Sequence, residues 1–411
     1  MDMKLDQADV VVIGGGIVGV SSAYFLKKAG YDVVLVEQHE LAYGASGRNA
    51  GFLWIHNRNK GMQLDISREG LRIYEEEYVP QLGNTFEYRR NGGMIYFYTE
   101  EQKKVFEEFV IARNNDGVPM QLLTAEEARA YAPILPENVL GATYCPEDGQ
   151  IRTPKLVRNL GNLCRHLGVR IYENTTVLGV MTEGNQTTGV RTNQGEIHAS
   201  KVVIASGAWS KLLGESLNID IPVSTERLGV IRTEPLPKLL DKVVYGPQAA
   251  KQYADIRSLP SFKDEYFLDV NEDPEAGVEN LELIAQCEDG SLLIGCPMDY
   301  PDTLQHYPTL GGLKLSIDTF LSQFPQYKGL GVDAVWAGLL PYTADALPII
   351  DEVEEYNGLF IAAGHVFGNL AGPATGKLVA ELISGQPTTL PLDELKLKRA
   401  SLREKELVTR W

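Results

Sequence analysis

Cysteine is scarce in this chain, and no two cysteines stand at a spacing typical of a metal site. Four occur among 411 residues, and none belongs to a C-x-x-C pair. Zinc sites need short, regular separations of cysteine or histidine, and disulfide-stapled domains need far more cysteine. The sequence therefore predicts neither a metal site nor a disulfide framework. Reduced thiols, and with them a cytoplasmic location, are expected for Cys145, Cys164, Cys287 and Cys296.

The sequence also lacks the long apolar runs that insertion into a membrane requires. No apolar run reaches the roughly 18–20 residues of a membrane span. The first nine residues show no basic stretch followed by an apolar one, the pattern that a secretory signal would need. We therefore expect a cytoplasmic protein with no integral membrane segment.

Positive charge is in short supply as well. The chain has 38 lysines and arginines against 55 acidic residues, which gives a formal net charge of −17. Binding to nucleic acid depends on cations that neutralise phosphates, and anionic membrane surfaces attract the same residues. The composition argues against both kinds of partner, and the excess of acid favours solubility.

The clearest positive signal is a strand, glycine turn, helix, strand and acid near the N-terminus. A β-branched run over 10–13 precedes the pattern G-x-G-x-x-G, formed by Gly14, Gly16 and Gly19, and Glu37 closes the next apolar run. The glycines permit a tight turn, a close approach to pyrophosphate and tight helix–sheet packing, and the helix N-terminus favours the phosphates. An acid at this distance accepts ribose hydroxyls. The pattern predicts that an adenine dinucleotide carries the chemistry.

The order of helices and strands indicates a discontinuous nucleotide-binding domain. Alternating helix and strand occurs at both ends of the chain and in its middle, whereas 221–300 is rich in short strands broken by proline and Asp-Gly. This layout predicts a mixed α/β fold, with a Rossmann-like domain and an inserted, mainly antiparallel β substrate domain. We expect 1–85, 150–220 and 330–390 to form the nucleotide-binding domain, 86–149 and 221–329 the substrate domain, and 391–411 a charged, helical C-terminal tail.

Three further segments strengthen the first motif. They are the glycine-rich loop 44–51, the strand end 203–210 with its sequence VIASGAWS, and the pair 338–348 and 363–376 near the C-terminus. In this order and spacing the chain resembles the D-amino-acid oxidase-like family of flavoenzymes over nearly its whole length. That family includes glycine, sarcosine and D-amino-acid oxidases and dehydrogenases, and the β-type subunits of opine and hydroxyproline dehydrogenases.

The resemblance implies FAD as the cofactor. Members that bind flavin covalently often have a histidine in the second loop, and 44–51 has none, so we expect noncovalent FAD. The loop 364–376, followed by a helix, would lie along the pyrimidine edge of the flavin. The cofactor-binding residues implied are Gly14, Gly16, Ile17, Val18, Gly19, Glu37, Gln38, Ala45, Ser46, Arg48, Asn49, Ala50, Gly51, Val177, Ser206, Gly207, Trp209, Gly338, Gly364, His365, Gly368, Asn369 and Leu370.

The resemblance implies oxidation of a CH–NH bond in a small-molecule amine or N-substituted amino acid. An amine needs no enzyme base beyond its own deprotonation, whereas an alcohol needs one, most often histidine. His365 and His56 are the candidates for such a base, and both also suit structural roles. The alternatives are a CH–OH dehydrogenase of a hydroxy acid, and a flavin subunit that needs a partner for electron transfer. A homo-oligomer also remains open. A plain NAD enzyme would leave the later segments without a role.

One position departs from the family pattern. Amino-acid-oxidising relatives often carry an arginine that pairs with the substrate carboxylate where this chain has Leu340. The sequence therefore disfavours glycine and small D-amino acids as substrates, and favours a larger secondary amine or N-substituted amino acid. Another arginine could take the carboxylate, and the candidates are Arg58, Arg227, Arg232 and Arg257. We expect the substrate pocket to include Trp54, Tyr253, Tyr266, Leu340 and Tyr342.

Overall fold

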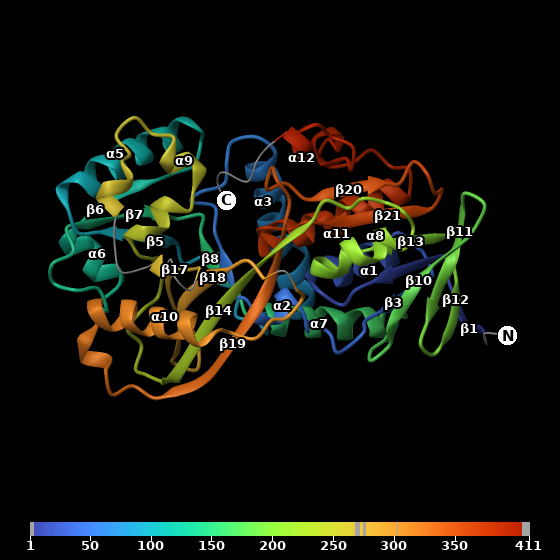
Figure 1. The fold of residues 1–411 in the computed structure, drawn as a ribbon, viewed down its shortest axis with the longest axis horizontal. Helices are drawn as coiled ribbons and strands as arrows, with labels where there is room; N and C mark the ends of the chain where they lie inside the picture. Colours follow the sequence, from blue (N-terminus) through green and yellow to red (C-terminus); the bar gives the residue numbers. More distant parts are fainter. Residues whose placement is uncertain (1–3, 268–271, 274–276, 302, 405–411) are drawn as a thin grey trace.

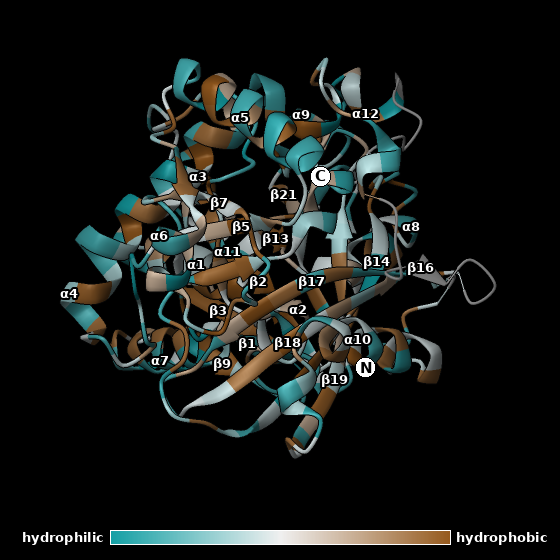
Figure 2. Cartoon of the chain, turned by 90° about the vertical axis from the view of Figure 1, so that its left-hand side faces the viewer, coloured by the Kyte–Doolittle hydropathy of each residue, from teal (hydrophilic) through white to brown (hydrophobic). Residues whose placement is uncertain are grey.

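Two large β-sheets divide the computed structural model into two parts that lie side by side (Figure 1). The structure describes residues 4–267, 272–273, 277–301 and 303–404. Figure 2 shows the hydrophobic residues concentrated on the inner strands, and hydrophilic ones on peripheral helices. The predicted mixed α/β class is confirmed. No helix in these described ranges is long and apolar enough to cross a bilayer.

The first sheet has six strands and is parallel except at one edge. Its central strands are apolar along their whole length, as expected for parallel strands covered on both faces. Only β20 runs antiparallel to its neighbour, β21. The order is β20 (Ile349–Glu352), β21 (Leu359–Ala363), β13 (Lys201–Ile204), β2 (Val10–Ile13), β3 (Val33–Val36) and β9 (Arg170–Tyr172).

Alternate residues of β2 face two different layers, because successive side chains of a strand point to opposite faces. Val10 and Val12 pack in a core with the helices α1 (Ile17–Lys28), α7 (Thr153–His166) and α11 (Gly368–Ile383). Val11 and Ile13 pack in a second core with a four-stranded sheet on the other face. That sheet consists of β1 (Lys4–Gln7), β12 (Gly195–His198), β11 (Gln186–Thr192) and β10 (Val177–Glu183).

The second large sheet is mainly antiparallel, as predicted, and only its β15–β5 pair is parallel. Helices α5 (Glu100–Asn115), α6 (Ala125–Tyr131) and α10 (Leu310–Gln323) pack against it. The strand β19 pairs with β14 here, although the expected boundary at residue 330 placed it with the nucleotide-binding part. The order is β19 (Val332–Tyr342), β14 (Ser224–Pro235), β18 (Ser291–Asp299), β17 (Val278–Gln286), β15 (Val243–Tyr245), β5 (Gly93–Phe97), β7 (Gly141–Cys145) and β6 (Gln121–Thr124), with β16 (Glu272–Asp273) paired to β17.

Short elements complete the described chain. The second glycine-rich loop holds one short helix, α2 (Ala45–Arg48), and β4 (Phe52–Leu53) pairs with β8 (Gly149–Gln150). The remaining α-helices are α3 (Met62–Ile73), α4 (Val79–Leu82), α8 (Ser210–Glu215), α9 (Ala254–Arg257) and α12 (Ser401–Glu404). A π-helical turn covers Tyr74–Tyr78, and 3₁₀ turns cover Gly207–Trp209, Pro247–Lys251, Asp264–Phe267, Pro325–Tyr327 and Asp393–Leu395.

The described part of the C-terminal tail is packed on the fold. Arg399 is buried and donates two hydrogen bonds to the carboxylate of Asp345, at 2.6 and 2.8 Å. Leu395, Leu397 and Leu402 are buried as well. The tail is helical only over α12 and one 3₁₀ turn, and its described residues act as a structural cover.

Helix α11 begins at Gly368, eight residues before the start at residue 376 that the sequence suggested. Pro373 favoured the later start, because proline inside a helix removes one backbone hydrogen bond. The carbonyl that loses this bond belongs to Asn369, four residues earlier. It accepts instead a hydrogen bond of 2.6 Å from the hydroxyl of Tyr74. This hydrogen bond from Tyr74, outside the helix, compensates for the proline and lets α11 begin at Gly368.

Removing this donor should destabilise the fold. We expect Tyr74→Phe to lower the free energy of unfolding by about 1–2 kcal/mol, because it leaves the partly buried carbonyl of Asn369 without this partner. The measurement is urea unfolding at neutral pH. Tyr88→Phe is the matched control, since the Tyr88 hydroxyl bonds the exposed carboxylate of Glu75. Equal effects of the two substitutions would contradict this account of α11.

Candidate functional site

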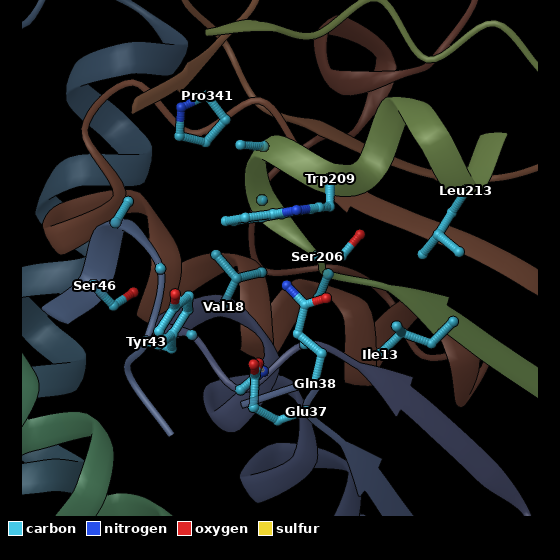
Figure 3. A pocket seen from close by; sticks show the side chains of 18 of the residues that line it. Ile13, Val18, Glu37, Gln38, Tyr43, Ser46, Ser206, Trp209, Leu213 and Pro341 are labelled. Atoms are coloured by element: carbon cyan, nitrogen blue, oxygen red, sulfur yellow. Dashed lines mark hydrogen bonds between the residues drawn. The ribbon is translucent and has the colours of Figure 1, made fainter. Parts of the chain in front are cut away.

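An elongated cavity of about 310 Å³ lies at the carboxyl ends of the parallel strands. The chain continues from β2 to β3 on one side of β2, and β13 lies on the other side, so β2 marks the point where the strand order reverses. Ligands of open α/β sheets bind at such a point. Figure 3 shows Glu37 and Gln38 toward one end of the view and Pro341 toward the other, with Val18 and Trp209 between them. We call this space the first cavity.

The glycine turn after β2 forms one wall of the first cavity. Gly14 has φ +112°, and a Cβ there would lie 2.4 Å from the carbonyl oxygen of Ala205. A Cβ on Gly19 would lie 1.9 Å from the carbonyl oxygen of Gly14, so helix and turn touch through backbone. Both positions therefore require glycine, and the contact brings the N-terminus of α1 against the cavity.

The N-terminus of α1 suits an anion. No side chain caps the helix at Gly16, and its first turn carries no acidic residue. The amide of Ile17 donates to the hydroxyl oxygen of Ser46 at 3.0 Å, which ties the second loop to this helix end. Free amides and the positive end of the helix dipole attract phosphate.

Glu37 closes the far end of the glycine turn. Its carboxylate accepts hydrogen bonds from the amide of Gly15 at 2.6 Å and from the amide of His39 at 2.9 Å. Burial raises the pKa of Glu37, against the lowering effect of these two bonds. It is the only carboxylate among the residues that line the first cavity. A ligand with negative phosphates therefore meets little repulsion there.

A second cavity of about 170 Å³ adjoins the first, toward the large antiparallel sheet. The two share Ile17, Ala45, Ser46, His365 and Gly368 as lining residues, so they form one continuous site. Aliphatic side chains from the large sheet form much of the second cavity. They are Leu228 and Val230 of β14, Leu281 and Leu283 of β17, and Leu340 of β19.

Asn49 links the second loop to helix α11 beside the second cavity. Its side-chain oxygen accepts from the amide of Gly51 at 2.8 Å, from the Thr153 hydroxyl at 2.9 Å and from the Asn369 amide group at 3.1 Å. Asn369 also donates to the carbonyl oxygen of Phe52 at 3.1 Å. These bonds fix the loop and the helix relative to each other.

His365 lies where the two cavities meet. Burial lowers the pKa of its imidazole to about 3. Its Nε2 forms a hydrogen bond of 2.8 Å with the hydroxyl of Thr375, one of the residues of α11. The ring is therefore neutral at physiological pH and is a weak base.

Arg58 is a buried cation in the wall of the second cavity. Its side chain is 4% exposed, and its Nε donates to the carbonyl oxygen of Trp54 at 2.9 Å. The guanidinium carbon lies 4.6 Å from the ring centre of Phe367. Burial lowers the pKa of Arg58, although nearby tyrosines and carboxylates oppose that shift. In the described ranges no carboxylate forms an ion pair with it.

Most predicted cofactor-site residues meet at the two cavities. The first is lined by Gly14, Gly16, Ile17, Val18, Glu37, Gln38, Ala45, Ser46, Val177, Ser206, Gly207, Trp209, His365 and Gly368. The second adds Arg48, Asn49, Ala50, Gly51, Asn369 and Leu370, together with the predicted pocket residues Trp54, Tyr253 and Leu340.

Three predicted glycines stand just behind the walls. Gly19 contacts the glycine turn, and Gly338 lies against the side chain of Arg48. Gly364 has φ +75° and lies against Thr343. These glycines shape the site through close packing and do not line it.

The structure does not bring His56 to either cavity. Its ring is fully buried, with Nδ1 2.9 Å from an oxygen of Asp148 and Nε2 2.7 Å from the hydroxyl of Thr143. It stacks on Trp54, with ring centres 4.6 Å apart. Because both nitrogens are bonded inside the core, His56 supports the cavity wall from behind and cannot reach a substrate.

Two predicted pocket tyrosines also lie elsewhere. Tyr266 is in a 3₁₀ turn, with the ammonium of Lys263 5.3 Å from its ring centre. Tyr342 is the last residue of β19 and makes an edge contact with Tyr300, at 6.4 Å between ring centres. Neither residue lines the two cavities. Their positions in the sequence did not show which face of its element each side chain occupies.

The other candidate arginines are engaged with acids away from the cavities. Arg227 pairs with Asp299, Arg232 with Asp289 and Asp333, and Arg257 with Asp264.

Some lining residues were missed by the sequence analysis. Phe52, Tyr245 and Phe367 line the second cavity, and Tyr43 lines the first. The apolar alternation of Leu281 and Leu283 on one face of β17 was a readable signal. The aromatic residues carried none, since aromatic side chains are common in any core.

Comparisons with known proteins agree with this geometry. The model of a family described as FAD dependent oxidoreductase (DAO) matches residues 9–382. Glycine oxidase from Geobacillus kaustophilus is 28% identical over 95% of this chain and 97% of its own. Dimethylglycine dehydrogenase of Rattus norvegicus is 25% identical over 95% of this chain and 44% of its own. The solved L-proline dehydrogenase from P. horikoshii has a TM-score of 0.80 at 26% identity, over 95% and 97% of the two chains.

The neutral state of His365 predicts a pH dependence of stability. Between its ordinary pKa of 6.5 and the folded value of about 3, only the unfolded chain binds a proton at this ring, so stability falls as pH falls through that window. From pH 7 to pH 5 this contribution is about 2 kcal/mol. We expect His365→Gln to lose that much less stability over this interval in urea unfolding. His166→Gln, at an exposed position of α7, is the control, and identical pH slopes for all three proteins would refute the assignment.

Proposed function

Because the chain belongs to the DAO family of FAD-dependent oxidoreductases, we propose that it oxidises a CH–NH bond of an amine or N-substituted amino acid. The product is an imine, which water converts to a carbonyl compound and a smaller amine. The similarity to glycine oxidases and to an L-proline dehydrogenase supports this reaction class.

The residues of the two cavities fit FAD. The amides at the start of α1 would hold the diphosphate, and Glu37 would hold the adenosine ribose. The second loop, from Ala45 to Gly51, and the start of α11 would hold the flavin. The first cavity presents one carboxylate in a protein of net charge −17, which suits a dianionic diphosphate. The lack of a histidine in the loop 44–51 supports noncovalent binding.

The observation that carries the reaction class is the absence of a neutral-range base among the lining residues of the second cavity. Burial raises the pKa of Tyr245, Tyr253 and Cys296, and lowers that of His365 to about 3. The remaining ionisable lining residues are the arginines at 48 and 58. An alcohol would need a general base here. An amine brings its own lone pair, so the site favours CH–NH over CH–OH chemistry.

The charge of the cavity also prepares the substrate. FAD, when bound, supplies the acceptor for a hydride from the substrate carbon. The guanidinium of Arg58 and the neutral ring of His365 place no negative charge nearby. A substrate ammonium is therefore disfavoured relative to the free amine, whose lone pair forms the C=N bond as the hydride leaves.

Three further assignments belong to this proposal. The six-stranded sheet with its covering layers is the FAD-binding domain, and the large sheet is the substrate domain, with β19 included in it. A cytoplasmic location is supported by four buried cysteines that are all unpaired. A partner subunit or a homo-oligomer remains a prediction from the family resemblance.

Anaerobic absorbance titration tests the reaction class. We expect the yellow band of the purified holoprotein to bleach with D- or L-amino acids, N-alkyl amino acids, opines or simple amines, because these supply the lone pair. Hydroxy acids with matching carbon skeletons are the controls and should not bleach it. Bleaching by the hydroxy acids alone would overturn the proposal in favour of CH–OH oxidation.

The mode of cofactor attachment is tested separately. We expect acid or heat denaturation, followed by centrifugation, to release all yellow colour into the supernatant as FAD, since the second loop offers no histidine for a covalent bond. Absorbance and mass spectrometry of the two fractions measure this. Flavin that stays with the precipitated chain, with a matching mass increase, would contradict noncovalent binding.

A further inference from the structure

Arg58 is a buried cation with which no described carboxylate forms an ion pair. Burying a cation costs several kcal/mol unless a partner of opposite charge compensates for it. Asp255 and Asp148 raise the pKa of Arg58 through electrostatic attraction, although neither lies within ion-pair distance of it. A buried cation in a cavity wall that lacks an ion pair is suited to bind an anion, because buried charges are usually paired.

Both neighbouring carboxylates are engaged elsewhere. Asp148 accepts from the amides of Ile55 and His56, at 2.6 and 3.0 Å, and bonds the His56 ring. Asp255 accepts from the side-chain amide of Asn57 at 3.2 Å. These bonds hold both carboxylates in place, and neither forms an ion pair with Arg58.

The backbone around Arg58 is fixed from behind the cavity. Arg113 is buried and donates to the carbonyl oxygens of His56, at 3.0 Å, and of Arg58, at 2.5 Å. The Nε of Arg58 donates a hydrogen bond to the carbonyl oxygen of Trp54, and its guanidinium lies over the ring of Phe367. The outer nitrogens are therefore held in a defined place, ready to bind a planar carboxylate with two parallel hydrogen bonds.

Arg48, the other cation in the lining of the second cavity, is already engaged with other groups. Its guanidinium lies 4.4 Å from the ring centre of Tyr43, and its Nη2 lies 3.3 Å from the ring nitrogen of His306. Its Nη1 contacts the carbonyl oxygen of Gly44 at 3.5 Å. These contacts hold the charge toward the outer loops, which leaves Arg58 as the cation available to a ligand among the described lining residues.

The rest of the second cavity selects apolar groups. Leu228, Leu281, Leu283 and Leu340 line it from three strands of the large sheet. Burying an alkyl group against such a wall is favourable in proportion to the apolar area removed from water. Glycine has no group to place there. Tyr245 and Tyr253, whose ring centres lie 6.5 Å apart, add hydroxyl groups beside these leucines.

We propose that Arg58 binds the substrate carboxylate and that the substrates are amino acids or N-alkyl amino acids with a sizeable apolar side chain. This inference rests on the proposed oxidation of a CH–NH bond. It also gives Leu340 a role. With Arg58 binding the carboxylate from the segment after β4, Leu340 on β19 is free to form part of the apolar wall. Glycine and carboxylate-free amines are then poor substrates.

The first test compares acids with their decarboxylated counterparts. Racemic N-methyl-leucine, N-methyl-isopentylamine and sarcosine are used with the holoenzyme in anaerobic flavin reduction. We expect N-methyl-leucine to exceed each of the other two by about a hundredfold in rate constant divided by apparent Kd. In Arg58→Met the advantage over the amine should fall to within about tenfold, with Arg58→Lys between the two. Arg257→Met, a change at an arginine outside the cavities, should keep the wild-type preference.

The second test reads binding without turnover. 4-Methylpentanoate, which has the carboxylate and the alkyl group but no amine, should perturb the flavin absorbance of the wild type. Its Kd should rise about a hundredfold in Arg58→Met, while Arg257→Met stays unchanged. Retained FAD and an unfolding midpoint near that of the wild type show that a variant is folded. If Arg58→Met is not folded, Arg58→Lys takes its place in the binding comparison.

The outcomes separate the two proposals. If amines with and without the carboxylate reduce the wild-type flavin equally well, the proposed function stands and the inference about Arg58 is overturned. Unchanged binding of 4-methylpentanoate in a folded Arg58→Met or Arg58→Lys variant also overturns it. If no amine reduces the flavin, the proposed function fails, while loss of carboxylate binding in the variants still supports the anion site.

Discussion

The rest of the site depends on one packing constraint, the backbone contact between helix α1 and its neighbours. Gly19 touches the turn at Gly14, and a Cβ on Gly376 of α11 would lie 2.5 Å from the backbone of Ser21 in α1. The two helices therefore pack backbone against backbone. Their N-termini, at Ile17 and Gly368, line the first and second cavities together. Two positive helix ends therefore face a site in an acidic protein.

The two sheets contribute different chemistry to the continuous site. The parallel sheet supplies loops at its carboxyl edge, with amides, one carboxylate and little else that is charged. The antiparallel sheet supplies a face, on which alternate residues such as Leu281 and Leu283 point to the cavity. The cations come from neither sheet: Arg48 and Arg58 stand on the segments around β4. The apolar wall and the cation Arg58 thus stand on parts of the chain other than the strands of the parallel sheet.

Local sequence predicted the parts of the site that depend on local geometry. The turn at Gly14, the acid at Glu37 and the loop from Ala45 to Gly51 lie where the motifs placed them, because neighbours in sequence determine a turn. Residues chosen by type fared differently. His56 is bonded inside the core. The early start of α11 depends on a hydroxyl from Tyr74, distant in sequence, so no local pattern contained it.

The sequence by itself determined the fold class, the family resemblance and the nucleotide-binding turn, since periodicity and glycine spacing act over a few residues. It named four arginines as carboxylate ligands without a means to choose. The tertiary structure separates these candidates, because three of them form ion pairs with acids, while Arg58 is buried and forms none with a described carboxylate. Burial and the absence of a counter-ion are properties of the surroundings in space. They arise only when segments far apart in the chain close around a side chain.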